Sequence, residues 1–109
     1  MQLLRELCKI HAPAGSEYKM TEFLLDYINK NKGNWKTLPQ IISGEGFQDN
    51  IMLVFGKPTT AIFAHMDSIG YTVGYENNLI KIGGPSAKAG AKLVGEDRKG
   101  KIECELLVI

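Results

Sequence analysis

The apolar residues in the first third of the chain recur at helical spacing. In residues 2–10 they follow the i, i+3, i+4, i+7 pattern of an amphipathic helix, with charged residues on the other face. A second helix is predicted over residues 17–31, because its apolar residues also share one broad face. Pro13 and Gly15 separate the two helices, since proline disfavours helical backbone at the residue before it.

After Trp35 the apolar pattern changes from helical to extended. Residues 35–43 predict a strand that Pro39 confines to a sheet edge. Residues 50–55 (NIMLVF) and 59–64 (TTAIFA) are nearly continuous apolar runs, with a turn between them. Such runs are typical of strands that are covered on both faces in the sheet of an α/β enzyme.

The chain beyond Asp67 is rich in glycine and shows no helical period. Residues 71–75, 79–82 and 101–109 predict short strands, with turns at 77–78 and 98–100. Helices followed by such strands predict a boundary near Ile69, between an α/β part at 1–69 and a small β module at 70–109. Because the sequence stops inside an apolar run, we expect this module to be truncated.

Composition and charge exclude several classes of protein. The formal net charge is +1, without the clustered basic patch of a nucleic-acid-binding protein. No apolar run is long enough to span a membrane, and the first ten residues do not form a signal peptide, so we expect a cytoplasmic protein without a membrane partner. Cys8 and Cys104 lack CxxC spacing, and we expect both to be buried as small apolar residues.

The strongest chemical signal is the segment AIFAHMDSIG at residues 61–70. It places His65 and Asp67 at the end of the predicted strand 59–64, where open α/β sheets bind ligands. Residues i and i+2 of a strand point the same way, so Asp67 can orient an imidazole whose other nitrogen binds a metal. The alternative is a hydrogen-bonded core histidine beside an aspartate that starts a turn, and the spacing alone leaves both open.

Several motifs together resemble the N-terminal part of the glutamyl-aminopeptidase (TET-type) family of di-metal exopeptidases. They are LLRELCKIHAPAGSE, DNIMLVFGK, AHMDSIGYTV and LIKIGGPSAKAG, and they cover nearly the whole chain. The chain departs from the family pattern at Ala14, where a serine is usual, and at Ser68, where an acidic residue commonly follows H-M-D.

The resemblance implies a fold, a cofactor and two residue roles. His65 would be a ligand of one of two divalent metal ions (zinc or cobalt), and Asp67 the catalytic-site carboxylate that orients it. Residues 1–69 would belong to an αβα catalytic domain, and residues 70–109 would begin an inserted β domain, PDZ-like or barrel-shaped, that mediates homo-oligomer contacts. The substrate would be a peptide, from which N-terminal residues are removed. The remaining ligands and the general base would lie further along the family's sequence.

Other interpretations stay open. The chain could be a non-catalytic αβ interaction module, or a peptidase-like deacylase on the same scaffold. His11, in the loop after the first helix, is expected to be structural or exposed to solvent. Gly83-Gly84 indicates a turn, and Glu103 and Glu105 indicate a solvated strand face. With so few metal donors, this chain alone is expected to be inactive, to bind no metal tightly, and to be oligomeric or marginally stable.

Overall fold

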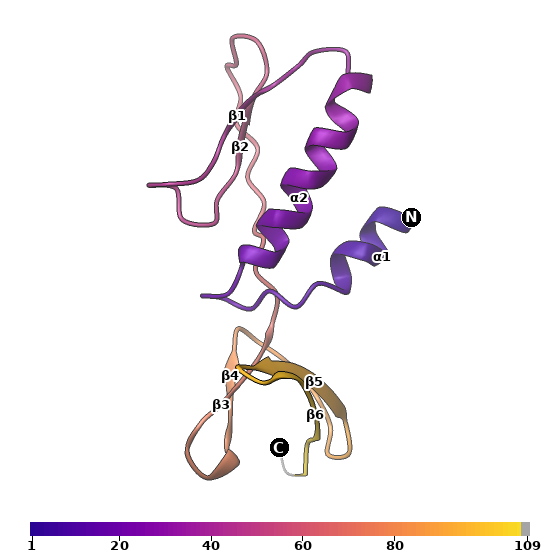
Figure 1. Ribbon diagram of the computed structural model, residues 1–109, viewed down its shortest axis with the longest axis vertical. Helices are drawn as coiled ribbons and strands as arrows, with labels where there is room; N and C mark the ends of the chain where they lie inside the picture. Colours follow the sequence, from indigo (N-terminus) through magenta and orange to yellow (C-terminus); the bar gives the residue numbers. More distant parts are fainter. Residues whose placement is uncertain (108–109) are drawn as a thin grey trace. The chain divides into compact units, whose positions relative to one another are not determined.

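A computed structural model describes residues 1–107 and divides the chain into two compact units, Met1–Ser68 and Ile69–Ile109. The chain combines helices with three small sheets, each a pair of antiparallel strands (Figure 1). No helix within residues 1–107 is both long enough and apolar enough to cross a membrane.

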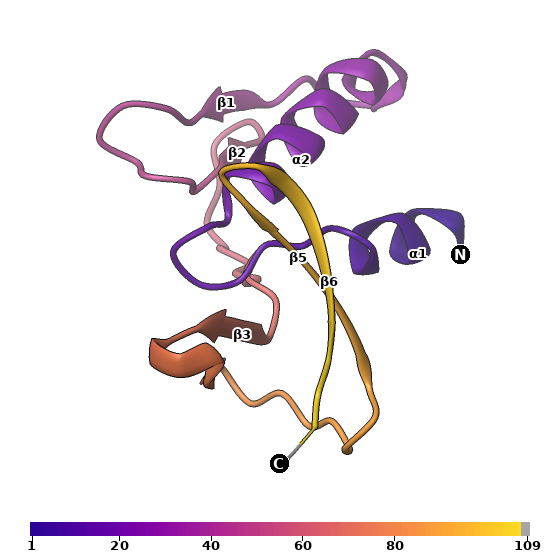
Figure 2. The same ribbon diagram turned by 60° about the horizontal axis from the view of Figure 1, so that its bottom comes forward.

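The first unit contains both α-helices and one hairpin-like strand pair. Helix α1 spans Gln2–Cys8 and helix α2 spans Tyr18–Asn31, followed by a 3₁₀ turn at Lys32–Asn34. Both predicted helices are therefore present, each one or two residues shorter than expected. Strand β1 (Gln40–Ile42) pairs antiparallel with β2 (Met52–Val54), and this pair lies beside α2 (Figures 1 and 2).

The core of the first unit is small. Ala12, Met20 and Ile28 are its buried apolar residues, whereas α1 buries none of its residues. Met20 and Ile28 are eight positions apart on α2, so they lie on one face of that helix. Aromatic contact adds to this packing, since the rings of Trp35 and Phe55 lie 6.1 Å apart at a tilted angle.

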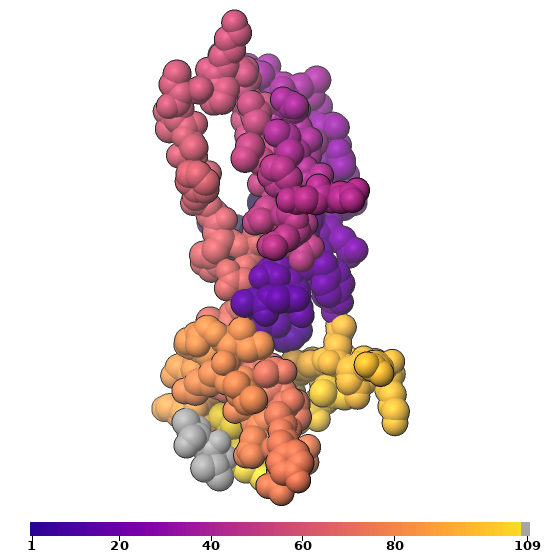
Figure 3. All heavy atoms as spheres, turned by 90° about the vertical axis from the view of Figure 1, so that its left-hand side faces the viewer, coloured from indigo at the N-terminus to yellow at the C-terminus, as the bar shows by residue number. Residues whose placement is uncertain are grey.

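Residues 59–64 do not form the predicted strand. The segment runs as an extended trace without a strand partner, and the spheres of Figure 3 show it standing apart from the rest of the first unit. Ile62 and Phe63 are 94% and 91% exposed. The apolar composition was a correct signal for extended backbone. The expectation of a sheet covered on both faces was wrong for this chain, because no described strand pairs with the segment.

The second unit consists of two antiparallel hairpins. Strand β3 (Gly70–Val73) pairs with β4 (Leu79–Ile82), and β5 (Lys92–Asp97) pairs with β6 (Gly100–Glu105). Strand β4 has the predicted bounds, β5 was not predicted, and β6 begins within one residue of its predicted start. The expected continuation of the last strand to Ile109 includes residues 108–109, which lie outside the described part.

The turns of the second unit use backbone conformations that the sequence indicated. A 3₁₀ turn at Tyr75–Asn77 joins β3 to β4, with Glu76 and Asn77 at positive φ. Gly100 has φ +124° at the start of β6, a conformation that glycine adopts without steric cost. The ladder of β5 and β6 continues through hydrogen bonds from the Gly90 and Leu106 amides, and the Leu106 side chain is buried.

A side-chain hydrogen bond joins α2 to the loop before β2. The Thr21 hydroxyl donates to the Asp49 carbonyl oxygen over 2.5 Å, and the contact is partly buried. We expect Thr21→Val to lower the free energy of unfolding by about 1 kcal/mol, because the valine keeps the shape and loses the donor. Urea unfolding measures this difference. Thr37→Val is the control, since Thr37 is exposed, and a loss as large as that of Thr21→Val would contradict the account.

Candidate functional site

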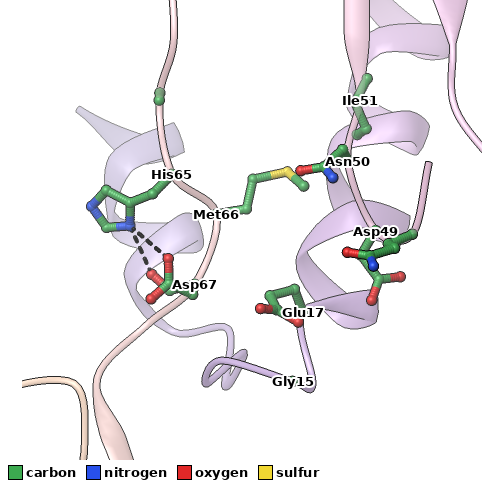
Figure 4. A pocket seen from close by; sticks show the side chains of 10 residues that line it. Gly15, Glu17, Asp49, Asn50, Ile51, His65, Met66 and Asp67 are labelled. Carbon is green, nitrogen blue, oxygen red and sulfur yellow. Dashed lines mark hydrogen bonds and ion pairs between the residues drawn. The ribbon is translucent and has the colours of Figure 1, made fainter.

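His65 and Asp67 are in direct contact, as their spacing predicted. The Nδ1 atom of His65 lies 3.2 Å from Oδ1 of Asp67 and 3.0 Å from the Asp67 carbonyl oxygen (Figure 4). Both oxygens are acceptors, so the contact favours the tautomer in which Nδ1 carries the hydrogen and donates it to them. In that tautomer Nε2 is unprotonated, and its lone pair is available to a ligand.

The pair is open to solvent rather than enclosed. The side chain of His65 is 85% exposed and that of Asp67 is 44% exposed. An interaction between groups this exposed contributes little to folding stability, because water screens the charges. The contact therefore matters for the orientation of the imidazole more than for the fold.

The expected position of the pair at the end of a central strand was wrong. Residues 59–64, directly before His65, form no strand. The backbone is instead held just after Asp67, where Ser68 forms an isolated parallel bridge with Pro13. The Ser68 amide donates to the Ala12 carbonyl over 2.7 Å, and the Ala12 amide donates to the Ser68 hydroxyl oxygen over 3.1 Å. Two segments far apart in the sequence thus fix the backbone next to the site.

A pocket of about 430 Å³ lies beside the pair within the first unit. Three segments line it, and its residues are Gly15, Glu17, Gln48, Asp49, Asn50, Ile51, Ala64, His65, Met66 and Asp67. In Figure 4 the Met66 side chain points across the pocket toward Asn50, whereas the imidazole of His65 lies on the other side of the segment with Asp67. This alternation is what an extended backbone imposes on successive side chains.

Sequence reasoning missed the carboxylates of Glu17 and Asp49 as part of this pocket. Glu17 is the residue at the start of α2, and Asp49 belongs to the loop before β2. Nothing in their local sequence distinguishes them from ordinary helix-start and turn residues. Only the fold brings both to the wall that faces residues 64–67.

A metal-binding role for His65 would need donors that the described residues do not group around it. Within residues 1–107 no three His, Cys, Asp or Glu side chains are grouped so that they could hold a metal ion. The His65–Asp67 contact fits a metal-ligand pair, because ligating histidines donate their second ring nitrogen to a carboxylate or a carbonyl. Further donors would have to come from outside these residues.

The other candidate residues take structural or surface positions. His11 is exposed in the loop after α1, and Gly83 turns the chain after β4 with φ +73°. Glu103 and Glu105 lie on the exposed strand β6, and Glu105 accepts a salt bridge from Lys92 at 3.4 Å. These positions agree with the sequence interpretation.

The expected burial of the two cysteines was wrong, since Cys8 and Cys104 are both exposed. The reason lies in their elements. Helix α1 buries no residue, and every residue of β6 is exposed. A cysteine on α1 or β6 is therefore not buried by its own element.

Comparison with known proteins assigns no family. No protein-family model matches the chain, and no curated protein matches it. The resemblance to the glutamyl-aminopeptidase family therefore rests on the motifs in the sequence, and membership is a proposal.

Proposed function

We propose that this chain is the N-terminal part of a metal-dependent aminopeptidase of the glutamyl-aminopeptidase (TET-type) family. Residues 1–69 would belong to its αβα catalytic domain and residues 70–109 to its inserted β domain. The observation that carries the proposal is the contact of His65 Nδ1 with both the carboxylate and the carbonyl oxygen of Asp67.

His65 would act through its Nε2 atom. Asp67 holds the ring hydrogen on Nδ1, which leaves the Nε2 lone pair to bind a divalent ion. When bound, a pair of zinc or cobalt ions supplies an activated water and polarises the scissile carbonyl group of a peptide. His65 is a single donor, so the chain needs additional ligands before it can hold such ions.

The proposal includes a cellular setting and partners. The substrate is a peptide from which N-terminal residues are removed, and the enzyme works in the cytoplasm as a homo-oligomer. A net charge of +1 without a basic cluster supports the expectation that nucleic acid is not a partner.

A non-catalytic interaction module is the second candidate. It is favoured by the large exposed apolar side chains of the first unit, which include Leu38 at 65% in addition to Ile62 and Phe63. Exposed apolar surface of this kind marks sites of protein contact. In the aminopeptidase proposal the same surface is covered by later parts of the catalytic domain.

Sequencing the reading frame beyond the codon for Ile109 separates the two candidates. The aminopeptidase proposal expects an aspartate at a strand end, an adjacent Glu-Glu pair and a late histidine, which are the donors that His65 lacks. A stop codon directly after Ile109 would refute the enzyme proposal for this polypeptide and favour the interaction module.

A further inference from the structure

Ala12 and Ser68 form a reciprocal pair of hydrogen bonds next to the His65–Asp67 contact. The Ser68 amide donates to the Ala12 carbonyl oxygen, and the Ala12 amide donates to the Ser68 hydroxyl. Ala12 is fully buried, so its backbone groups have no access to water as an alternative partner. The pair therefore fixes the backbone of Ser68 relative to the loop before α2.

The peptide group between Asp67 and Ser68 transmits this constraint to the imidazole. Its N–H belongs to Ser68 and donates to Ala12 over 2.7 Å, while its carbonyl oxygen belongs to Asp67 and lies 3.0 Å from His65 Nδ1. The bond is trans, so the N–H and the carbonyl point in opposite directions in one plane. Because the Ser68 N–H is held by Ala12, the direction of the Asp67 carbonyl group toward the imidazole of His65 is also fixed.

We infer that Ser68 and Ala12 are positioning residues that hold His65 in the tautomer protonated at Nδ1. The Ser68 hydroxyl holds the loop segment at Ala12 in place, and the shared peptide group directs the Asp67 carbonyl toward the imidazole. Hydrogen bonds arranged in such a chain polarise and strengthen one another. The preference for this tautomer is argued from the hydrogen bonds alone. Only the identity of the ligand that Nε2 would bind rests on the proposed function.

The tautomer can be measured directly on the 109-residue chain. Long-range ¹H–¹⁵N correlation spectra at alkaline pH, where the ring is neutral, separate the Nδ1–H form from the Nε2–H form. We expect His65 to be mainly Nδ1–H. His11 is an internal reference in the same spectrum, because it is exposed and makes no such contact, and it is expected to favour the Nε2–H form of a free side chain.

Variants at Ser68 test its positioning role. Ser68→Ala removes the hydroxyl that accepts from the Ala12 amide. We expect the Nδ1–H to Nε2–H ratio of His65 to fall by up to about fivefold, the limit set by one lost hydrogen bond, because the change reaches the ring only through the backbone. Ser68→Thr keeps the hydroxyl and is expected to retain the ratio. Ser16→Ala is the matched control, because Ser16 is exposed in the same loop region. Backbone amide spectra report whether each variant folds.

Two results would overturn the inference. The first is an unmodified chain in which His65 shows the same tautomer mixture as His11, a result that needs no variant. The second is a folded Ser68→Ala chain with an unchanged His65 ratio. Neither result bears on peptidase activity. Conversely, the expected tautomer in a protein without peptidase activity would refute the proposed function and leave this inference standing.

Discussion

The aminopeptidase proposal predicts that His65→Ala in the complete enzyme lowers kcat/KM for peptide N-termini by more than about 100-fold. The loss exceeds the 10–100-fold that removal of a residue behind a ligand usually costs, because the variant lacks the proposed ligand itself. For Asp67→Asn we expect kcat/KM to be lowered by about 10–100-fold. The asparagine side chain still accepts a hydrogen bond but no longer carries a negative charge. Initial rates on aminoacyl anilides, with metal content by elemental analysis, measure both effects.

His11→Ala is the matched control for the His65 variant. His11 lies in the loop after α1 and is exposed, so its removal is expected to change kcat/KM by less than about twofold. Equal losses for the His11 and His65 variants would contradict the assigned role of His65. So would a His65→Ala protein that retains its full metal content and activity.

The 109-residue chain by itself is expected to associate in solution. Ile62 and Phe63 are almost fully exposed on a segment whose extended backbone has no strand partner among the described residues. Extended backbone whose amide and carbonyl groups lack a neighbouring strand can pair with another chain, as an open sheet edge does. Burying each large apolar side chain contributes about 1.5–3 kcal/mol, which is considerable beside the 5–15 kcal/mol that stabilises a typical domain.

Sedimentation velocity on the chain and two variants tests this association. Ile62→Lys places a charge on the exposed segment and is expected to raise the dissociation constant at least about tenfold, equivalent to 1.4 kcal/mol. Tyr75→Lys, at an equally exposed position in the second unit, is expected to leave it unchanged. A monodisperse monomer with a cooperative melt above about 65 °C, the upper edge for mesophile domains, would contradict the expectation.

Local patterns predicted the helices and one strand pair well. The apolar spacing of residues 17–31 located α2 because an amphipathic face is a property of the segment itself. The strands β3 and β4 are joined by a short turn, so their pairing is also local. Strand β5 escaped prediction because Gly95 and the charged residues around it leave only a short apolar stretch.

Long-range pairing could not be predicted from these patterns. Residues 59–64 have the composition of a buried strand, but a strand in a sheet also needs a neighbour, which composition does not supply. Strand β2 was expected in a sheet covered on both faces, yet it lies in a two-stranded sheet with β1, and its Met52 is 47% exposed. The order and direction of strands depend on contacts between distant segments.

In the candidate site, too, contacts between residues close in sequence were predicted, and contacts between distant residues were not. The contact of His65 with Asp67 follows from a spacing of two residues, which an extended backbone turns into a shared side. The hydrogen bonds between Ala12 and Ser68 join residues that are 56 positions apart, and no local sequence pattern predicts them. Glu17 and Asp49 likewise meet only around the folded pocket.

The most direct test of the aminopeptidase proposal is an activity assay of the complete protein before and after removal of its metal. The account predicts hydrolysis of peptide N-termini that is lost on chelation and restored by zinc or cobalt, with no measurable activity or tightly bound metal in the 109-residue chain alone. Hydrolysis that survives complete removal of metal would contradict the account, as would a complete protein that binds two divalent ions and cleaves no peptide.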